Sequence, residues 1–464
     1  RKLSFFLKNT AALLFAAIVC VINSRGGIQE RTINLNTAAK YAVPNHYNLV
    51  LNSSFTFLRT IGYEGITDYN FFNEEELSTI YSPVFHAENK KLSPKPTDNN
   101  LNIVVIILES FSSEFSSLFN RNLQESYTPN LDSIARLGTY MLSYANGTRS
   151  MEAIPAIISS VPTLMNSEFI SSNYSSNKIT SLPYLLDKLN YTSAFMHGGN
   201  NGTMYFDRYA NMAGYDYYYG RNEYKNDKDY DGNWGIFDDK FLKYCIGQMD
   251  TITTPFFTTI FTLSSHQPYT LPSDYLEKHP VDEPSIVNSV KYADYSLGKF
   301  FDMASQSEWF DNTLFVITAD HAFQTPVDND YNSRQGRYQT PIVLYHADNK
   351  IVTNKSFTQQ IDIMPTILDY INYPDTVFSF GKSIFDSHYP FSINYIGNTY
   401  QFITEDYYII FDGANIVAIY SRAKDPRQWN NIKDKIELPQ KEIDLMKAFL
   451  QTYNHSLLYN KMSY

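Results

Sequence analysis

The feature that most limits how this chain can fold is the apolar run at residues 102–108, with the sequence NIVVIIL. A strand inside a parallel sheet is covered on both faces, so it carries continuous aliphatic and β-branched residues instead of alternating apolar and polar ones. Shorter runs of the same kind occur at residues 193–196, 256–263, 313–318 and 341–345. Together these runs predict a mostly parallel central sheet.

Helical patterns lie between these runs, at residues 182–189, 289–303 and 359–371. Strands that alternate with helices favour an α/β fold in which helices sandwich the sheet. After about residue 380 the pattern changes to Tyr-rich alternation, which is typical of antiparallel strands. The late strands are expected near Tyr400, Tyr407 and Ile416, before a final helix from about Gln440. The chain is therefore predicted to end in a small antiparallel subdomain.

The first residues add a second constraint, because residues 11–22 are continuously apolar and residues 3–7 extend the stretch. Its length is about the ~20 residues that a helix needs to cross a bilayer. No small-x-small cleavage site follows, so a transmembrane helix is favoured over a cleaved signal peptide, with a buried core helix as the third alternative. Since the chain starts with Arg1 instead of Met, we expect this helix to be the end of a longer membrane region.

A Pro- and Asn-rich stretch, KLSPKPTDNN, ends at residue 100 and is typical of a linker. We expect a transmembrane helix at residues 1–24, a linker or pre-domain segment at 25–100, a catalytic domain at 101–380, and the antiparallel subdomain with its helix at 381–464. The formal net charge is -11, and the Lys and Arg residues are scattered along the chain. This distribution argues against nucleic acid as a partner.

Polar residues follow three of the predicted strands at the point where each strand ends. Glu109 follows the first run, His197 follows the second, and Asp320 with His321 follows the fourth. In sheets of this kind ligands bind outside the carboxyl ends of the strands. Two carboxylates and an imidazole at one edge of the sheet predict a site for a divalent cation.

A nucleophile is expected beside that cation. Ser150 precedes the apolar pattern MEAIPAIISS, which can start a helix, and Thr148 lies two residues earlier. Free N–H groups at a helix N-terminus stabilise an alkoxide and bind phosphate oxygens, and metal coordination lowers the pKa of a hydroxyl further. The alternative interpretation is that one of these hydroxyls only caps the helix.

Six short motifs occur in one order along the chain. They are Leu108-Glu109-Ser110, Gly147-Thr148-Arg149-Ser150, His197-Gly198-Gly199, Ser264-Ser265-His266-Gln267-Pro268-Tyr269, Thr318-Ala319-Asp320-His321 and the run at residues 360–368. In this order they resemble the lipoteichoic acid synthase-like phosphoglycerol transferases, a branch of the sulfatase (alkaline phosphatase) superfamily. The resemblance covers roughly residues 25–385. It implies a sulfatase-type fold with N-terminal membrane spans and an extracytoplasmic catalytic domain.

The resemblance also implies one divalent ion, of the Mn²⁺ type with Zn²⁺ or Mg²⁺ as alternatives. Its ligands would be Glu109, the nucleophile hydroxyl, Asp320 and His321. The nucleophile in this family is usually Thr, which favours Thr148 by residue identity. The spacing to the following Ser-Val-Pro segment favours Ser150, and Ser150 is the residue that we predict.

Substrate contacts are implied in the same way. His266 resembles the family histidine that contacts the glycerol-phosphate group, and His197 is a further candidate for substrate binding. The family has a Trp-x-Arg element after its His-Gly strand, and this chain has NGTMYFDR instead. Arg208, at the end of that stretch, is predicted to keep the phosphate contact.

These features predict a metal-dependent phosphoryl transferase in the inner or plasma membrane, with its catalytic domain extracytoplasmic or periplasmic. It would move phosphoglycerol from a phospholipid to a glycan or lipid acceptor through a covalent Ser or Thr intermediate. A phosphoethanolamine transferase and a phosphodiesterase or sulfatase-type hydrolase are alternatives, and a catalytically inactive binding protein on the same fold is another. Sulfatase activity is disfavoured because Ser150-Met-Glu-Ala-Ile lacks the x-Pro-x-Arg sequence that formylglycine formation requires.

Overall fold

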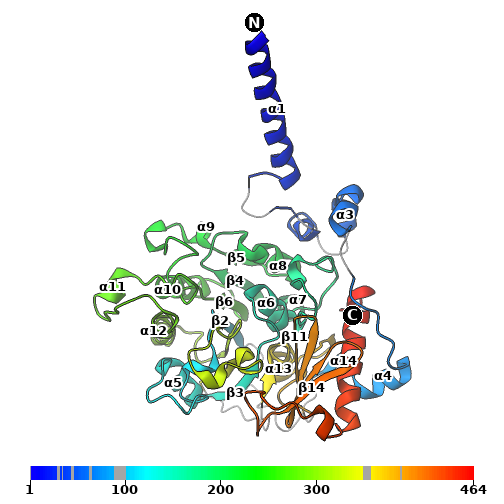
Figure 1. The fold of residues 1–464 in the computed structure, drawn as a ribbon. Coiled ribbons are helices and arrows are strands. Elements are labelled where there is room, and N and C mark those ends of the chain that lie inside the picture. Colours follow the sequence, from blue (N-terminus) through cyan, green and yellow to red (C-terminus); the bar gives the residue numbers. More distant parts are fainter. Residues whose placement is uncertain are drawn as a thin grey trace.

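An eight-stranded sheet forms the centre of the computed structural model (Figure 1). The structure describes residues 2–28, 32–33, 35–42, 46–61, 65–87, 101–347, 357–386 and 389–463. The strands of this sheet are β2 (Asn102–Leu108), β3 (Thr139–Tyr144), β4 (Thr192–His197), β5 (Tyr217–Tyr219), β6 (Phe256–Phe261), β7 (Thr313–Ala319), β8 (Gln339–Tyr345) and β9 (Thr358–Gln359).

The strands lie in the order β5-β4-β6-β2-β7-β8-β3-β9. All neighbouring pairs are parallel except the two that β8 makes, with β7 and with β3, which are antiparallel. The α/β fold class with a mostly parallel sheet is therefore confirmed. The apolar runs predicted β2, β4, β6, β7 and β8, but not β3 or the short strands β5 and β9.

The central strand β2 is buried on both faces, as its continuous apolar run requires. Successive side chains of a strand point to opposite faces. Val104 and Ile106 accordingly pack into one hydrophobic core, and Ile103 and Val105 pack into the core on the opposite face. Complete burial of an aliphatic side chain contributes roughly 1.5–3 kcal/mol to stability, so this strand holds the two layers of helices together.

Helices cover both faces of the sheet (Figure 1). Those on the Val104 face are α5 (Pro129–Leu137), α10 (Asp238–Met249) and α12 (Ile286–Ala304). Those on the Ile103 face are α6 (Ser150–Ser159), α7 (Leu182–Asp187), α8 (Phe206–Ala213) and α13 (Ile363–Tyr370), and α14 (Gln440–Leu458) contributes to the same hydrophobic core. Two short helices, α9 (Arg221–Tyr224) and α11 (Ser273–Leu276), lie in the connections.

A second, four-stranded sheet follows near the C-terminus and packs beside α14 (Figure 1). Its strands pair antiparallel in sequence order. They are β11 (Ser392–Ile396), β12 (Thr399–Ile403), β13 (Tyr407–Phe411) and β14 (Ile416–Ser421). The predicted C-terminal antiparallel sheet and final helix are thus present, and β11 is a strand that the pattern did not predict.

The N-terminal helix α1 (Lys2–Arg25) extends away from the body with its apolar side chains exposed (Figure 1). Its 24 residues span about 36 Å at 1.5 Å per residue. It is long and apolar enough to cross a bilayer. A membrane anchor and a signal sequence both have this length and composition.

Several parts of the segment between α1 and the sheet are docked on the body. The 3-10 helix η1 (Leu35–Lys40) contacts α8, and β1 (Val84–His86) pairs antiparallel with β10 (Thr376–Phe378). The other helices of this segment are α2 (Tyr47–Val50), α3 (Ser53–Thr60) and α4 (Glu74–Ile80). The predicted KLSPKPTDNN linker lies outside the described residues.

A candidate active site at the end of strands β2 and β7

Glu109 and Asp320 lie side by side because β2 and β7 are parallel neighbours. Leu108 is paired with Ala319, so the residue that follows each strand leaves the sheet at the same edge. Both carboxylates are enclosed, since Glu109 is 1% exposed and Asp320 is 0% exposed. The sheet register therefore brings together two acidic groups that are far apart in the sequence.

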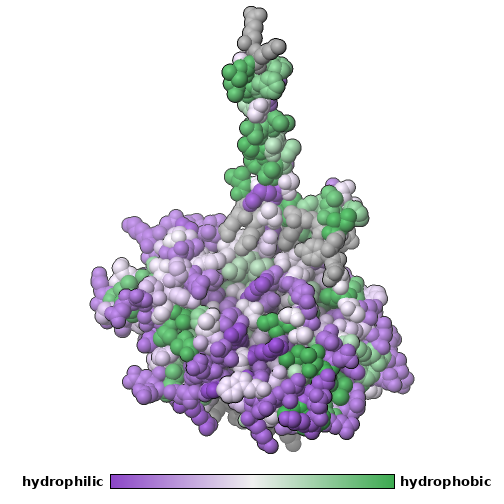
Figure 2. Space-filling view, in the orientation of Figure 1, coloured by the Kyte–Doolittle hydropathy of each residue, from purple (hydrophilic) through white to green (hydrophobic). Residues whose placement is uncertain are grey.

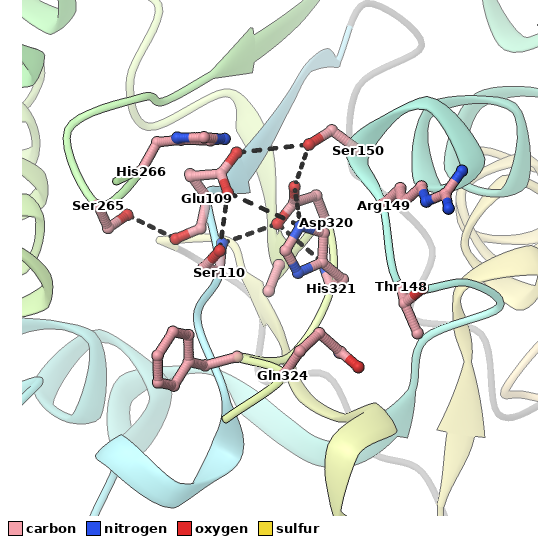
Figure 3. Close-up of polar contacts among 12 residues, drawn as sticks. Glu109, Ser110, Thr148, Arg149, Ser150, Ser265, His266, Asp320, His321 and Gln324 are labelled. Carbon is pink, nitrogen blue, oxygen red and sulfur yellow. Dashed lines mark hydrogen bonds and ion pairs between the residues drawn. The ribbon is translucent and has the colours of Figure 1, made fainter. Parts of the chain in front are cut away.

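His321 joins these carboxylates in a cluster that could hold a metal ion (Figure 3). Its Nε2 lies 3.3 Å from Asp320 Oδ2 and 3.7 Å from Glu109 Oε1. Two atoms that bind one ion at about 2.0–2.2 Å each are roughly 3–4 Å apart. The three side chains are therefore spaced as ligands of a single ion.

The His321 ring is oriented by the backbone next to it. Its Nδ1 lies 3.0 Å from the carbonyl oxygen of Ala322. A carbonyl oxygen can only accept a hydrogen bond, so Nδ1 carries a hydrogen and Nε2 is the ring nitrogen directed at the two carboxylates. Nε2 is thus the nitrogen that could bind a metal ion.

Backbone N–H groups fix the Asp320 carboxylate. Its Oδ1 accepts hydrogen bonds from the N–H groups of Ser110 at 2.8 Å and His321 at 2.7 Å. The Gln360 side chain donates to the carbonyl oxygens of Ala319 at 2.8 Å and Asp320 at 2.6 Å, which holds the end of β7. Oδ2 is left on the side that faces His321.

Glu109 is held in a similar way. The hydroxyl of Ser110 donates to Glu109 Oε1 at 2.7 Å, and the hydroxyl of Ser265 donates to the Glu109 carbonyl at 2.5 Å. Ser110 has a φ of 57°, in the left-handed region that costs a non-glycine residue of the order of 1–2 kcal/mol. In this conformation the N–H of Ser110 donates to Asp320 while the hydroxyl of Ser110 donates to Glu109.

The electrostatics of the cluster favour a bound cation. Burial raises the pKa of Glu109 well above its ordinary value, and the nearby charge of Asp320 raises the pKa further. Two buried carboxylates at this separation repel each other unless a positive charge compensates them. Two carboxylates, an imidazole lone pair and a neighbouring hydroxyl form a donor set that fits a divalent cation such as Mn²⁺ or Zn²⁺.

That hydroxyl belongs to Ser150, the first residue of α6 (Figure 3). Its Oγ donates to Asp320 Oδ2 at 2.7 Å and lies 3.4 Å from Glu109 Oε2. The helix begins here because Arg149 is extended and the Glu152 carboxylate accepts the Arg149 N–H at 3.1 Å. The first N–H groups of a helix have no intrahelical partner, so they make this end a suitable place for an anion.

Thr148, the alternative nucleophile, is placed differently. Its N–H donates to Glu152 Oε2 at 2.6 Å, so its backbone supports the start of α6. Figure 3 shows its side chain apart from the two carboxylates, whereas Ser150 points toward them. Of the two hydroxyls, the structure brings Ser150 to the cluster.

His266 lies in the loop after β6 and is turned toward the cluster (Figure 3). Its ring packs on Trp234, with the ring centroids 3.9 Å apart, and its Nδ1 lies 2.9 Å from the Gln267 carbonyl oxygen. Trp234 Nε1 donates to the same carbonyl oxygen at 2.6 Å. The half-buried histidine is thus held at the rim of the site.

His197 is not brought to the cluster. It ends β4, which is separated from β2 by β6, and neighbouring strands are about 4.8 Å apart. Its ring is 0% exposed, stacks on Phe261 and contacts Phe206 at its edge. Burial lowers the pKa of His197 to about 4, so the ring is neutral and enclosed beneath the loop that follows.

Arg208, the predicted phosphate contact, makes its described contacts with residues at and before η1 and with Tyr205. Arg208 lies in α8 and is 7% exposed. Its guanidinium donates to Thr37 Oγ1 at 3.1 Å and to the Thr32 carbonyl at 3.4 Å, and it lies over the Tyr205 ring. Arg208 follows the His197-Gly198-Gly199 motif in the sequence, but the sequence could not show which side of α8 faces the body and therefore where the Arg208 side chain points.

Three residues that support the cluster had no predicted role, namely Ser110, Ser265 and Gln360. Each lies inside one of the motifs that carried the resemblance. Their roles are to fix backbone groups or carboxylate rotamers, and these contacts join segments that are distant in the sequence. A motif match could have drawn attention to them, but the type of contact required the folded structure.

Residues 101–373 match the family model described as Sulfatase. Lipoteichoic acid synthase 1 of Bacillus subtilis (strain 168) is 24% identical over 414 residues, which are 82% of this chain and 63% of that protein. Lipoteichoic acid synthase of Staphylococcus saprophyticus is 24% identical over 447 residues, which are 89% of this chain and 67% of that protein. The chain thus spans about two thirds of the length of these curated relatives. These matches confirm the resemblance inferred from the motifs.

Two solved structures share the fold. A protein of the alkaline phosphatase superfamily from Vibrio parahaemolyticus has a TM-score of 0.73 at 22% identity, covering 85% of this chain and 98% of that one. The lipoteichoic acid synthase LtaP from Listeria monocytogenes has a TM-score of 0.64 at 20% identity, covering 78% of this chain and 94% of that one. The chain therefore shares its fold with these two structures.

Proposed function

Because this chain belongs to the sulfatase family, we propose that it is a membrane-anchored phosphoryl transferase that moves phosphoglycerol from a phospholipid head group to a glycan or lipid acceptor. The distant relationship to lipoteichoic acid synthases supports this choice of reaction within the family. The reaction would take place outside the cytoplasm, on the side of the membrane that carries the catalytic body.

One observation carries the proposal. The hydroxyl of Ser150 lies at the N-terminus of α6 and 2.7 Å from Asp320 Oδ2, inside the cluster of Glu109, Asp320 and His321. A nucleophile at this place has an acceptor for its proton on one side and unpaired N–H groups for a phosphate oxygen on the other.

Glu109, Asp320, His321 and the Ser150 hydroxyl would hold a divalent cation. When bound, the cation would lower the pKa of the hydroxyl and stabilise negative charge on the phosphate oxygens. The residues themselves hold the geometry, because the hydrogen bonds to both carboxylates come from parts of the chain that are buried.

The proposed reaction has two steps. In the first step Ser150 Oγ forms a bond to the phosphorus of the head group, and the bond from phosphorus to the diacylglycerol oxygen breaks. Ser150 Oγ loses its proton to solvent, and the diacylglycerol oxygen gains a proton from solvent. In the second step an acceptor hydroxyl loses its proton to solvent and attacks the same phosphorus, the Oγ–P bond breaks, and Ser150 Oγ regains a proton from solvent.

Recognition of the head group is proposed for the rim of the site. His266 would hydrogen-bond the glycerol part through Nε2, because its Nδ1 hydrogen is directed at the Gln267 carbonyl. Trp234 would keep the His266 ring in this orientation through the close ring contact. The proposal leaves Arg208 and His197 out of direct substrate contact.

The test is to incubate the full chain in detergent micelles with phosphatidylglycerol that is labelled in its head group. We expect released diacylglycerol and a labelled protein whose phosphoglycerol adduct maps to Ser150 by mass spectrometry. Phosphatidylethanolamine serves as the competing donor. Release of diacylglycerol from phosphatidylethanolamine alone would favour a phosphoethanolamine transferase, and absence of a covalent adduct with either lipid would contradict the transferase mechanism.

A further inference from the structure

The body of the protein covers only part of the apolar face of the short helix α3. Leu51 and Phe55 are half-buried, and Leu51 packs against the main hydrophobic core. Phe57, Leu58 and Ile61 are instead 63%, 68% and 61% exposed. At 100° per residue, the helical positions Phe55, Phe57 and Leu58 span nearly half of the circumference of α3. A surface helix normally turns polar residues outward, so the uncovered part of this arc requires another apolar medium.

The preceding helix α2 extends the exposed apolar surface. Leu49 is 83% exposed and Val50 is 44% exposed. We call the five exposed side chains the juxtamembrane patch: Leu49, Val50, Phe57, Leu58 and Ile61. Outside α1, seven of the sixteen exposed large apolar side chains of the described chain fall within residues 28–61, and the other nine are scattered over the remainder. Single exposed apolar residues are normal, but a concentration of this kind marks an interaction surface.

The patch lies on the side of the body that carries the helix that could cross the bilayer. Figures 1 and 2 show α3 on this side, from which α1 rises. Figure 2 shows apolar surface on both elements. The apolar length of α1 ends at Asn23, Ser24 and Arg25, which are polar and suited to the membrane–water interface.

The segment that carries the patch is also fixed to the body. Leu35 and Ala38 of η1 are 6% and 2% exposed, and η1 contacts α8. The Arg208 guanidinium donates to Thr37 Oγ1 and to the Thr32 carbonyl. The residues that precede the patch are therefore attached to the folded body, and Leu51, which lies between the two parts of the patch, packs on the main hydrophobic core.

We propose that the juxtamembrane patch inserts into the surface of the bilayer beside α1, as a second, monotopic membrane contact. Interfacial helices of this kind bury their apolar side chains about 5–10 Å into the boundary between head groups and acyl chains. The occupant is lipid because the adjacent α1 already brings this face of the body to the membrane. The inference rests on the proposed membrane span of α1.

Two membrane contacts restrain the orientation of the catalytic body more than a single membrane contact does. A single helix followed by a flexible connection would let the body rotate about the point of attachment. Insertion at α1 and at the patch fixes its tilt and its height above the lipid head groups. An enzyme that acts on a phospholipid then meets its donor in the same orientation at each encounter.

The test measures the depth of an introduced label in the full chain. Leu58→Cys, in a Cys20→Ser background, carries an environment-sensitive nitrobenzoxadiazole label, and Cys245 stays unlabelled because it is buried. The chain is reconstituted in vesicles of phosphatidylcholine and phosphatidylglycerol that contain lipids with a quenching doxyl group. We expect a blue-shifted emission and roughly 2-fold or stronger quenching by lipids whose doxyl group lies near the head group, as for an interfacial helix.

Val417→Cys is the matched control, because Val417 is 45% exposed on β14 of the C-terminal sheet. Its label should not be quenched. A second variant, Phe57→Glu with Leu58→Glu, should reduce the quenching of a label at Ile61→Cys to the level of the control, while α1 keeps the chain in the membrane.

Equal quenching at Leu58→Cys and Val417→Cys in a membrane-bound chain would overturn the proposal. A blue shift at Leu58→Cys without quenching by lipid would also overturn it, since it would indicate a protein partner on the patch. Release of the chain by a carbonate wash is a distinct result, because it would refute the membrane span on which the inference rests.

Discussion

At the scale of single residues, the site depends on two carboxylates that are costly to bury. Glu109 and Asp320 are enclosed, and burial followed by the charge of Asp320 raises the pKa of Glu109. Hydrogen bonds from Ser110 and His321 orient them, but hydrogen bonds alone do not remove the repulsion between two charges. The arrangement therefore persists best with a cation between them.

The first prediction concerns Asp320→Ala. Removing one anionic ligand from a site of about four donors should abolish metal binding and lower turnover by several orders of magnitude. Metal content is measured by elemental analysis of the purified protein, and turnover by release of diacylglycerol. The control is Asp311→Ala, an exposed carboxylate just before β7, which should keep both. Full activity of Asp320→Ala would refute the site.

The second prediction separates the two hydroxyls at the start of α6. Ser150→Ala removes the group that lies 2.7 Å from Asp320, so turnover should fall by several orders of magnitude. Thr148→Ala keeps the hydrogen bond from the backbone N–H of residue 148 to Glu152 and should lower turnover by about 10-fold or less. Initial rates and mass spectrometry of the quenched enzyme measure the effect. A phosphoglycerol adduct on Thr148 would contradict the assignment.

At the scale of elements, the helices on the Val104 face are joined by a buried cap. Asp294 on α12 is 1% exposed and accepts hydrogen bonds from the N–H groups of Asn130 and Leu131, both at 2.9 Å. These N–H groups belong to the first turn of α5, where an anion is favourable. The Asp294 side chain thus accepts the free N–H groups at the start of α5 and holds α5 against α12.

The third prediction is that Asp294→Ala lowers the free energy of unfolding by about 2–4 kcal/mol, because buried donors of α5 lose their charged acceptor. Urea unfolding followed by tryptophan fluorescence measures the change. Asp302→Ala, an exposed residue on the same helix, is the control and should change stability by less than about 0.5 kcal/mol. Equal effects of the two variants would show that the cap does not stabilise the fold.

At the scale of the whole molecule, metal binding and folding should be coupled. The proposed ligands lie directly after β2 and β7 and at the start of α6, so the site exists only when these distant segments are assembled.

The fourth prediction is that adding Mn²⁺ to the chelated protein raises its melting temperature. A ligand present at 100 times its dissociation constant stabilises the native state by about 2.7 kcal/mol. Differential scanning fluorimetry measures the shift, and Asp320→Ala should lose it. A shift of the same size in that variant would place the binding elsewhere.

The fifth prediction concerns α1. If its 24 residues span the bilayer, the full chain should remain in the membrane fraction after a carbonate wash. Immunoblotting of pellet and supernatant measures the distribution. Recovery of the chain in the supernatant would indicate that α1 is a removed signal or a helix that packs on protein.

The sequence by itself determined the class of fold and the two acidic positions of the candidate site. Continuous apolar runs identify strands that are buried on both faces, and this is a local property that burial imposes on every residue of the strand. Glu109 and Asp320 directly follow two such runs. Parallel strands end at one edge of a sheet, so the pattern places both residues at that edge, and the pairing of β2 with β7 in the folded sheet brings them into contact.

Only the tertiary structure decided the direction of β8, the place of β3 and the roles of the remaining site residues. A strand has the same apolar pattern in either direction, so its pairing depends on partners that are distant in the sequence. The direction in which a side chain points depends on which face of its helix or strand packs on the body. That packing turns Ser150 toward Asp320, encloses His197 and directs Arg208 to Thr37. It depends on contacts among segments that are distant in the sequence, so no local sequence pattern predicts it.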